Sequence, residues 1–113
     1  MEEDWVLRQI KQAVDGLGYL LKRNIETIEL GENMSEDGKT IPTYDLILQY
    51  LESKRFHDAF LIVDSLKYKL STYDFNTVSS WFIEYLKAIN NGNTSWIDIS
   101  EIEKYRELLT QLI

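Results

Sequence analysis

The chain has 113 residues, a formal net charge of −7, a single histidine and no cysteine. This length fits one domain, residues 1–113, with enough chain to bury a hydrophobic core. The lack of cysteine excludes disulfides, thiol nucleophiles and cysteine-based zinc sites. The twelve basic residues are scattered rather than clustered, so we expect neither nucleic acid nor an anionic membrane as a partner.

The composition favours helices over strands. Hydrophobic residues make up 44% of the chain, too many for a disordered protein, and one proline with five glycines provides too few turns for a β-sandwich. The N-terminus, MEEDW, is acidic where a signal peptide would be basic, and no apolar run reaches the ~18 residues of a membrane span. We therefore expect a cytoplasmic protein.

The first predicted element is a long amphipathic helix within residues 2–30. Its apolar residues recur at intervals of three and four and include Leu7, Ile10, Val14, Leu17 and Leu21. Residues 24–30 alternate weakly, but they more simply continue this helix than form a strand. The long stripe offers a surface for a second copy, so a homodimer through the first helix is one expectation.

Residues 31–42 are polar and predict an exposed loop. Several side chains imitate positions one, three, five and six of a calcium-binding EF-hand loop: Asn33, Ser35, Asp37 and Gly38. The twelfth position needs a glutamate that binds calcium through both oxygens, and here it is Tyr44. We expect a solvated loop without a metal ion.

Four more helices are predicted after Pro42, over residues 43–53, 56–71, 77–89 and 100–113. Each has an apolar stripe at helical spacing, such as Phe56, Ala59, Val63 and Leu66 in the second. Asp74 is the expected cap of the third, and Ser100 with Glu103 forms a capping box for the fourth. The predicted fold class is all-α, with about five helices in an antiparallel array and no strand.

His57 and Asp58 are the first candidates for chemistry, because His57 is the only imidazole. Neighbours on a helix point about 100° apart, so these two side chains cannot form a catalytic dyad with each other. No nucleophile stands at a familiar spacing, and paired carboxylates without a repeated Glu-x-x-His motif do not make a di-iron site. We therefore predict no catalytic residue, no metal site and no cofactor.

The aromatic residues are the remaining candidates for a binding role. Core packing explains most of them, but tryptophan and tyrosine also anchor protein interfaces. A pocket between helices would be lined by Tyr50, His57, Trp81 and Tyr85. Trp96, in the loop before the last helix, is a candidate contact for a partner.

The middle of the chain resembles one degenerate tetratricopeptide (TPR) hairpin. Leu46, Tyr50, Ala59 and Val63 stand at the matching separations, and RFHDA, residues 55–59, resembles the turn with Ala59 as the small residue where two helices approach. The glycine position is Ile47 and the late proline is missing, whereas solenoids usually need about three repeats.

The whole chain also resembles a family of small, uncharacterised, mostly Gram-positive bacterial proteins, a domain of unknown function. The resemblance rests on DWVLRQI, residues 4–10, on the repeat-like hairpin and on ISEIEKY, residues 99–105. It implies an all-helical fold and no known activity.

Two functions remain open from the sequence. The first is a non-catalytic protein-interaction or self-association domain of TPR-like type, whose partner is another protein or a second copy. The second is a small-molecule-binding regulatory domain or a minor enzyme with a pocket between its helices.

Overall fold

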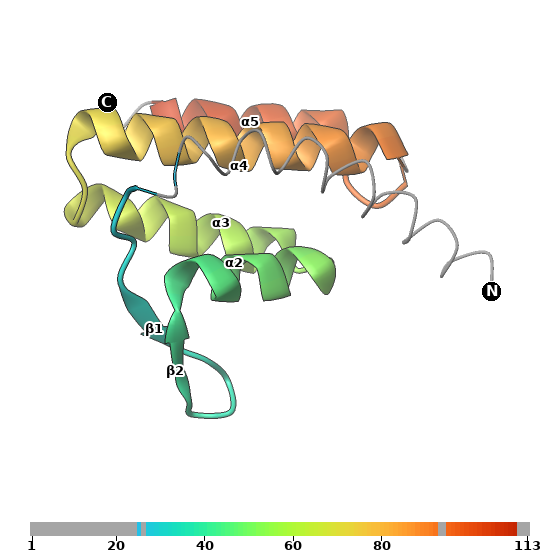
Figure 1. Ribbon diagram of the computed structural model, residues 1–113. Coiled ribbons are helices and arrows are strands. Elements are labelled where there is room, and N and C mark those ends of the chain that lie inside the picture. The colour runs from blue at the N-terminus through green and yellow to red at the C-terminus, as the bar shows by residue number, and fades with distance from the viewer. Residues whose placement is uncertain (1–24, 26, 93–94, 111–113) are drawn as a thin grey trace.

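The computed structural model describes residue 25, residues 27–92 and residues 95–110 of the chain. Within them the chain forms four α-helices and one two-stranded sheet (Figure 1). The elements are β1 (Glu32–Met34), β2 (Thr40–Pro42), α2 (Thr43–Glu52), α3 (Phe56–Ser65), a 3-10 turn (Leu66–Tyr68), α4 (Thr72–Gly92) and α5 (Ile99–Thr110). The fold is mostly helical, as predicted. The stripe of the first predicted helix, and the homodimer proposed through it, lie outside the described residues.

The strand pair corrects the prediction of a loop without strands. β1 and β2 are antiparallel, with Asn33 opposite Ile41, and Figure 1 shows them projecting as a hairpin beside α2. Strands of three residues whose middle side chain is only half-buried carry no alternating pattern that a sequence can reveal.

The residues that imitate a calcium loop build this hairpin instead. The Asp37 carboxylate accepts hydrogen bonds from the Ser35 hydroxyl and from the Lys39 backbone N–H, the latter at 3.2 Å. Gly38 has a φ of +85°, which favours glycine, and the Asn33 amide donates to the buried Thr43 hydroxyl at 2.8 Å. In the described part of the chain, no group of three His, Asp or Glu side chains could hold a metal ion.

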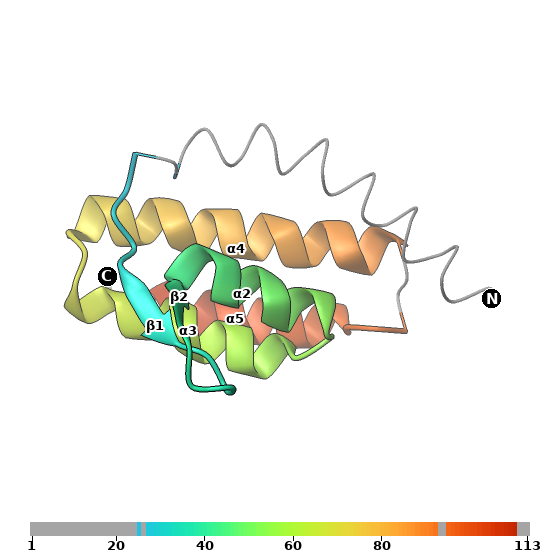
Figure 2. The same ribbon diagram turned by 60° about the horizontal axis from the view of Figure 1, so that its bottom comes forward.

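The helices form two stacked hairpins. α2 packs against α3 and α4 packs against α5, and both views show one pair lying beside the other (Figures 1 and 2). Tyr44 of α2 meets Trp81 of α4 with ring centroids 5.5 Å apart, and Phe60 of α3 stacks on Tyr105 of α5 at 4.6 Å. One aromatic pair therefore joins α2 to α4, and another joins α3 to α5.

α4 is the central helix, because it is buried on several sides. The fully or almost fully buried side chains along it are Phe75, Val78, Trp81, Phe82, Ile83, Leu86 and Ile89. Trp81 and Leu86 are core residues of this helix, whereas Tyr85 is half-buried. A helix that is apolar over most of its circumference is expected to lie inside a bundle.

Three helix ends differ from the sequence expectation. α3 ends at Ser65 and the chain continues as a 3-10 turn. The N-terminal cap of α4 is Ser71 rather than Asp74, because the Asp74 backbone N–H donates to the Ser71 hydroxyl at 3.1 Å. The cap of α5 is Asp98 rather than Ser100, since the Ser100 N–H donates to the Asp98 carboxylate at 3.2 Å.

None of the described helices combines the length and the hydropathy that crossing a membrane requires.

Candidate functional site

The five residues predicted for a pocket or interface fall into two groups by their ring contacts. Tyr50, His57 and Trp96 have their contacts around the turn between α2 and α3, or next to it. Trp81 and Tyr85 lie on α4 with ring centroids 5.7 Å apart. The two groups differ in their surroundings. Around the α2–α3 turn the charged side chains are paired, whereas on α4 the Trp81 N–H has no partner among the described residues.

The α2–α3 turn, residues 53–55, is a hydrogen-bonded Schellman motif. The Lys54 N–H donates to the Leu51 carbonyl at 3.2 Å, and the Arg55 N–H reaches the Tyr50 carbonyl at 2.8 Å. Lys54 has a φ of +63°, in the left-handed region where such caps usually place glycine. The backbone of this turn is therefore satisfied, at the expense of one strained lysine.

Arg55 ties this turn to two other segments. Its guanidinium forms ion pairs with Glu36 of the β-hairpin turn at 2.6 Å and with Asp58 of α3 at 2.8 Å, and it lies 4.5 Å from the Tyr50 ring centroid. Hydrogen bonds to Glu36 and then to Asp58 raise the pKa of Arg55. Arg55 and Tyr50 thus form a structural clamp whose charges are matched.

Lys54 forms a second clamp with Trp96. Its ammonium group lies 4.1 Å from the centre of the indole ring, in the segment that leads into α5. The same segment is held by the Asn90 amide, which donates to the Ile97 carbonyl at 2.7 Å. Trp96 is therefore engaged inside the molecule, with part of its surface exposed.

His57 is exposed and lies among rings rather than beside acids. Its ring centroid is 6.2 Å from Phe60 and 6.3 Å from Tyr105. The carboxylate of its neighbour, Asp58, is bound by Arg55. An imidazole becomes a general base when a carboxylate orients it and a nucleophile is within reach, and the described contacts of His57 provide neither.

Tyr105, whose ring lies against those of His57 and Phe60, has a strongly raised pKa. It is buried, and its hydroxyl donates to the Glu101 carboxylate at 3.1 Å. Burial first, and then the negative charge and hydrogen bond of Glu101, raise its pKa to about 12. A phenol held in its neutral form is a structural hydrogen-bond donor and not an acid at neutral pH.

The outer side of α4 is different, because hollows flank it. We call the first the α4 hollow; it measures about 440 Å³ and is lined by Thr27, Ile28, Tyr73, Asp74, Asn76, Thr77, Ser80, Trp81 and Glu84. Trp81 is 2% exposed, and its indole N–H has no hydrogen-bond partner among the described residues. Tyr73, at the first turn of α4, is 81% exposed. The unpaired N–H calls for an explanation, and the exposed tyrosine beside a hollow makes this face the candidate binding surface.

A second hollow lies on the α5 side of α4. Asn76, Ser80 and Glu84 line both hollows, at intervals of one helical turn. These three side chains form a polar ridge on α4 with a depression on each side.

The sequence reasoning singled out Trp81 but missed Tyr73 and the ridge. Tyr73 stands at the first turn of a helix that was predicted to begin later, so it was assigned to a loop. A signal existed, because Tyr73, Asn76 and Ser80 recur at helical spacing on a face without large aliphatic residues.

No family model matches the chain, and no curated protein or solved structure matches it significantly. The function is therefore argued from the contacts, hollows and charges above.

Proposed function

We propose that this chain is a non-catalytic protein-interaction domain of TPR-like helical type, which binds a basic peptide segment of a partner in the α4 hollow. The observation that carries the proposal is the pairing of Tyr73, 81% exposed, with a hollow of about 440 Å³ whose buried Trp81 N–H has no partner among the described residues. Tyrosine is among the residues that most often anchor protein interfaces.

The stacking of the helices supports the TPR-like type. Two consecutive hairpins lie with first helix on first helix, through Tyr44 and Trp81, and second on second, through Phe60 and Tyr105. Repeat proteins stack hairpins in this way and bind extended segments along one face of the stack. In this proposal α4 provides that face.

The charge of the hollow supports a basic partner. Its charged lining residues are Asp74 and Glu84, both acidic, and the whole chain carries a net charge of −7. A lysine or arginine of a peptide would find the Asp74 carboxylate, and it would compete with Lys87 for Glu84, which pairs with Lys87 at 3.5 Å.

The test compares two tyrosines of equal exposure. A display library of short random peptides is selected on the full chain, and the affinities of the enriched peptides are measured for the wild type and for two variants. Tyr73→Ala removes the tyrosine at the hollow, and we expect it to weaken binding about tenfold. Tyr68→Ala is the matched control, because Tyr68 is 83% exposed and does not line the α4 hollow.

We expect the enriched peptides to carry lysine or arginine and to bind Tyr68→Ala like the wild type. Acidic enriched peptides, or equal losses for the two variants, would contradict the proposal.

A second candidate is a small-molecule-binding regulatory domain that uses the same hollow. Its volume falls in the range of about 300 to 1,000 Å³ that ligand pockets occupy. A thermal-shift screen of metabolites separates the two. This candidate requires a compound that stabilises the wild type but not Trp81→Phe, which keeps one aromatic ring and removes the indole N–H. A screen without any such compound argues against it.

Three further expectations remain proposals. The chain acts in the cytoplasm, it belongs to the Gram-positive bacterial family that DWVLRQI and ISEIEKY resemble, and it has no enzymatic activity. The last is supported by His57, whose neighbouring carboxylate is bound by Arg55.

A further inference from the structure

The second hollow, which we call the α4–α5 groove, contains a buried hydroxyl without a partner. The groove measures about 230 Å³ and is lined by Asn76, Ser79, Ser80, Ile83, Glu84, Lys87, Arg106, Leu109 and Thr110. Ser79 is only 6% exposed, and its hydroxyl finds no hydrogen-bond partner among the described residues. A buried hydroxyl that is left unpaired is costly, so a native structure that keeps one calls for an explanation.

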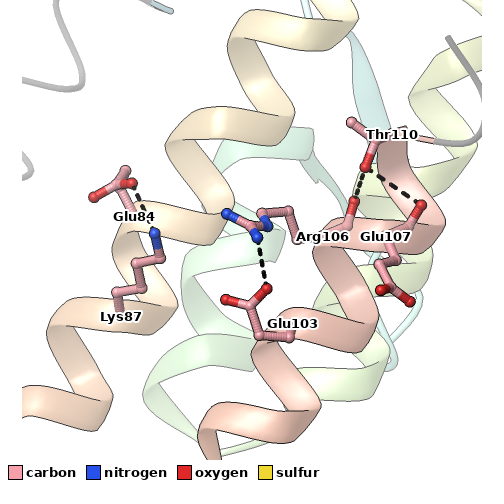
Figure 3. A network of polar contacts seen from close by, with 6 residues as sticks. All are labelled: Glu84, Lys87, Glu103, Arg106, Glu107 and Thr110. Atoms are coloured by element: carbon pink, nitrogen blue, oxygen red, sulfur yellow. Dashed lines mark hydrogen bonds and ion pairs between the residues drawn. The ribbon is translucent and has the colours of Figure 1, made fainter.

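Two cations line the same groove. Figure 3 shows Arg106 extending from α5 toward α4, on the side where Lys87 and Glu84 stand. Lys87 pairs with Glu84 at 3.5 Å along α4, and Arg106 pairs through Nη2 with Glu103 at 2.7 Å along α5. Both pairs link neighbouring turns of one helix, and neither crosses the groove.

Arg106 keeps donors for a further partner. A guanidinium has five N–H donors, and the ion pair with Glu103 engages one of its nitrogens. The side chain is 55% exposed, so solvent and solutes reach it. The Thr110 hydroxyl, by contrast, is committed to the carbonyls of Arg106 and Glu107 at the end of α5 (Figure 3).

We propose that the α4–α5 groove binds a small oxyanion, a carboxylate or a phosphate group, through the Arg106 guanidinium and the Ser79 hydroxyl. A planar guanidinium matches the paired oxygens of these anions, and an anion oxygen accepts the hydrogen bond that Ser79 otherwise lacks. Lys87 adds positive charge at the rim, while Ile83 and Leu109 provide an apolar floor for the rest of the ligand. The volume limits the ligand to a small one.

This site is distinct from the proposed peptide surface, although the two share three lining residues. The groove contains neither Tyr73 nor Trp81, and the α4 hollow contains neither Arg106 nor Ser79. The polar ridge of Asn76, Ser80 and Glu84 borders both, so an anion in the groove would lie across one helix from a bound peptide.

The experiment titrates the full-length chain with inorganic phosphate and, separately, with acetate, at constant ionic strength set with chloride. Binding is followed residue by residue through backbone amide NMR shifts. We expect saturable shifts confined to residues of α4 and α5 around the groove, for at least one of the two anions. The anion that binds more tightly identifies the ligand class.

Two variants and one control decide the assignment. Arg106→Gln is expected to weaken the binding about tenfold or more, because it removes a charge-assisted contact. Lys104→Gln is the matched control: it removes one positive charge from an exposed position of the same helix outside the groove, and it should leave the affinity within about twofold.

Ser79→Ala gives a readout that a purely structural serine would not. It should weaken anion binding several-fold while leaving the melting temperature without anion equal to or above that of the wild type, because the hydroxyl has no partner to lose among the described residues. The proposal is overturned if neither anion saturates by about 20 mM. It is also overturned if Arg106→Gln and Lys104→Gln weaken binding equally, which would show only diffuse attraction to charge.

Discussion

Polar groups at the α2–α3 turn have partners within the chain, whereas two polar groups of α4 have none among the described residues. At the turn, Arg55 has two carboxylates and a ring, Lys54 has the Trp96 ring, and the backbone closes a Schellman motif. On α4, the Trp81 N–H and the Ser79 hydroxyl have no described partner, and each belongs to the lining of a hollow.

This difference separates stability from binding. Polar groups that are paired within the chain stabilise the fold and have few hydrogen bonds left to offer a ligand. Unpaired polar groups beside a hollow destabilise the fold, and a ligand can supply the missing hydrogen bonds. His57, the only histidine, is an obvious candidate for catalysis, but it lies next to the α2–α3 turn, where the charged side chains are paired.

The largest effect is expected on the inner side of α4. Phe82 is fully buried, and Phe82→Ala should lower the free energy of unfolding by about 3–5 kcal/mol, because it removes a ring from a packed core and leaves a cavity. Urea denaturation measures the loss. Tyr73→Ala on the same helix should change it by less than about 0.5 kcal/mol, and a large loss there would show that Tyr73 is structural.

The next largest effect is expected where α2 and α3 approach each other closely. Ala59 has no exposed surface, so Ala59→Leu should destabilise the fold by about 1–3 kcal/mol through overpacking of α3 against its neighbours. Leu61→Ala, at a 48% exposed position of the same helix, is the control and should cost less than about 1 kcal/mol. A neutral Ala59→Leu would mean that the helices have room between them.

Tyr105 should make the fold sensitive to alkali. Its pKa is about 12 in the folded chain against an ordinary value of 10.0, so the folded state holds the proton more tightly than the unfolded state. The resulting stability, on the order of 2 kcal/mol, is fully present below pH 10 and is lost as the pH rises to about 12. Tyr105→Phe should lose less stability than the wild type over this interval. Parallel curves for the two proteins would contradict the assignment.

The Lys54–Trp96 clamp should contribute a smaller, measurable coupling. Lys54→Gly relieves the left-handed backbone but loses the cation over the ring, so the two effects oppose each other. In a Trp96→Leu background the contact with the ring is already lost, so Lys54→Gly should be less destabilising there than in the wild type. The double-mutant cycle should give a coupling energy of about 0.5–1 kcal/mol; a value near zero would mean that the contact is incidental.

His57 should give the smallest effect. It is exposed, so His57→Ala is expected to change the free energy of unfolding by less than about 0.5 kcal/mol. Thermal denaturation of the two proteins in the same buffer measures the difference. A loss of several kcal/mol would show that His57 is a structural residue that stabilises the fold.

The sequence predicted the helical parts of this fold because apolar residues at intervals of three and four report directly on a buried face. The pattern predicts a buried stripe that includes Phe56, Ala59 and Val63, and these residues are buried. The β-hairpin was missed because its strands are three residues long and bury no face. Asp74 and Ser100 were chosen as caps where Ser71 and Asp98 serve, since neighbouring polar residues compete for the same role.

The candidate sites were less accessible to sequence reasoning. Tyr50, His57 and Trp96 were chosen for residue type, but the contacts of Tyr50 and Trp96 are with Arg55 and Lys54, cations that no periodic pattern singled out. Ser79 matters because its buried hydroxyl has no hydrogen-bond partner in the described part of the chain, and this depends on how α4 packs against α5. The lack of a hydrogen-bond partner can be recognised only from the three-dimensional structure.

Amide hydrogen exchange on the full chain, with and without the best peptide from the display selection, tests the central contrast most directly. The account predicts that the peptide slows exchange in residues 73–84 of α4, while residues 50–58 around the α2–α3 turn exchange at the same rate in both samples. Protection of the turn, with α4 unchanged, would contradict it and would place the binding surface at the end where the charges are already matched.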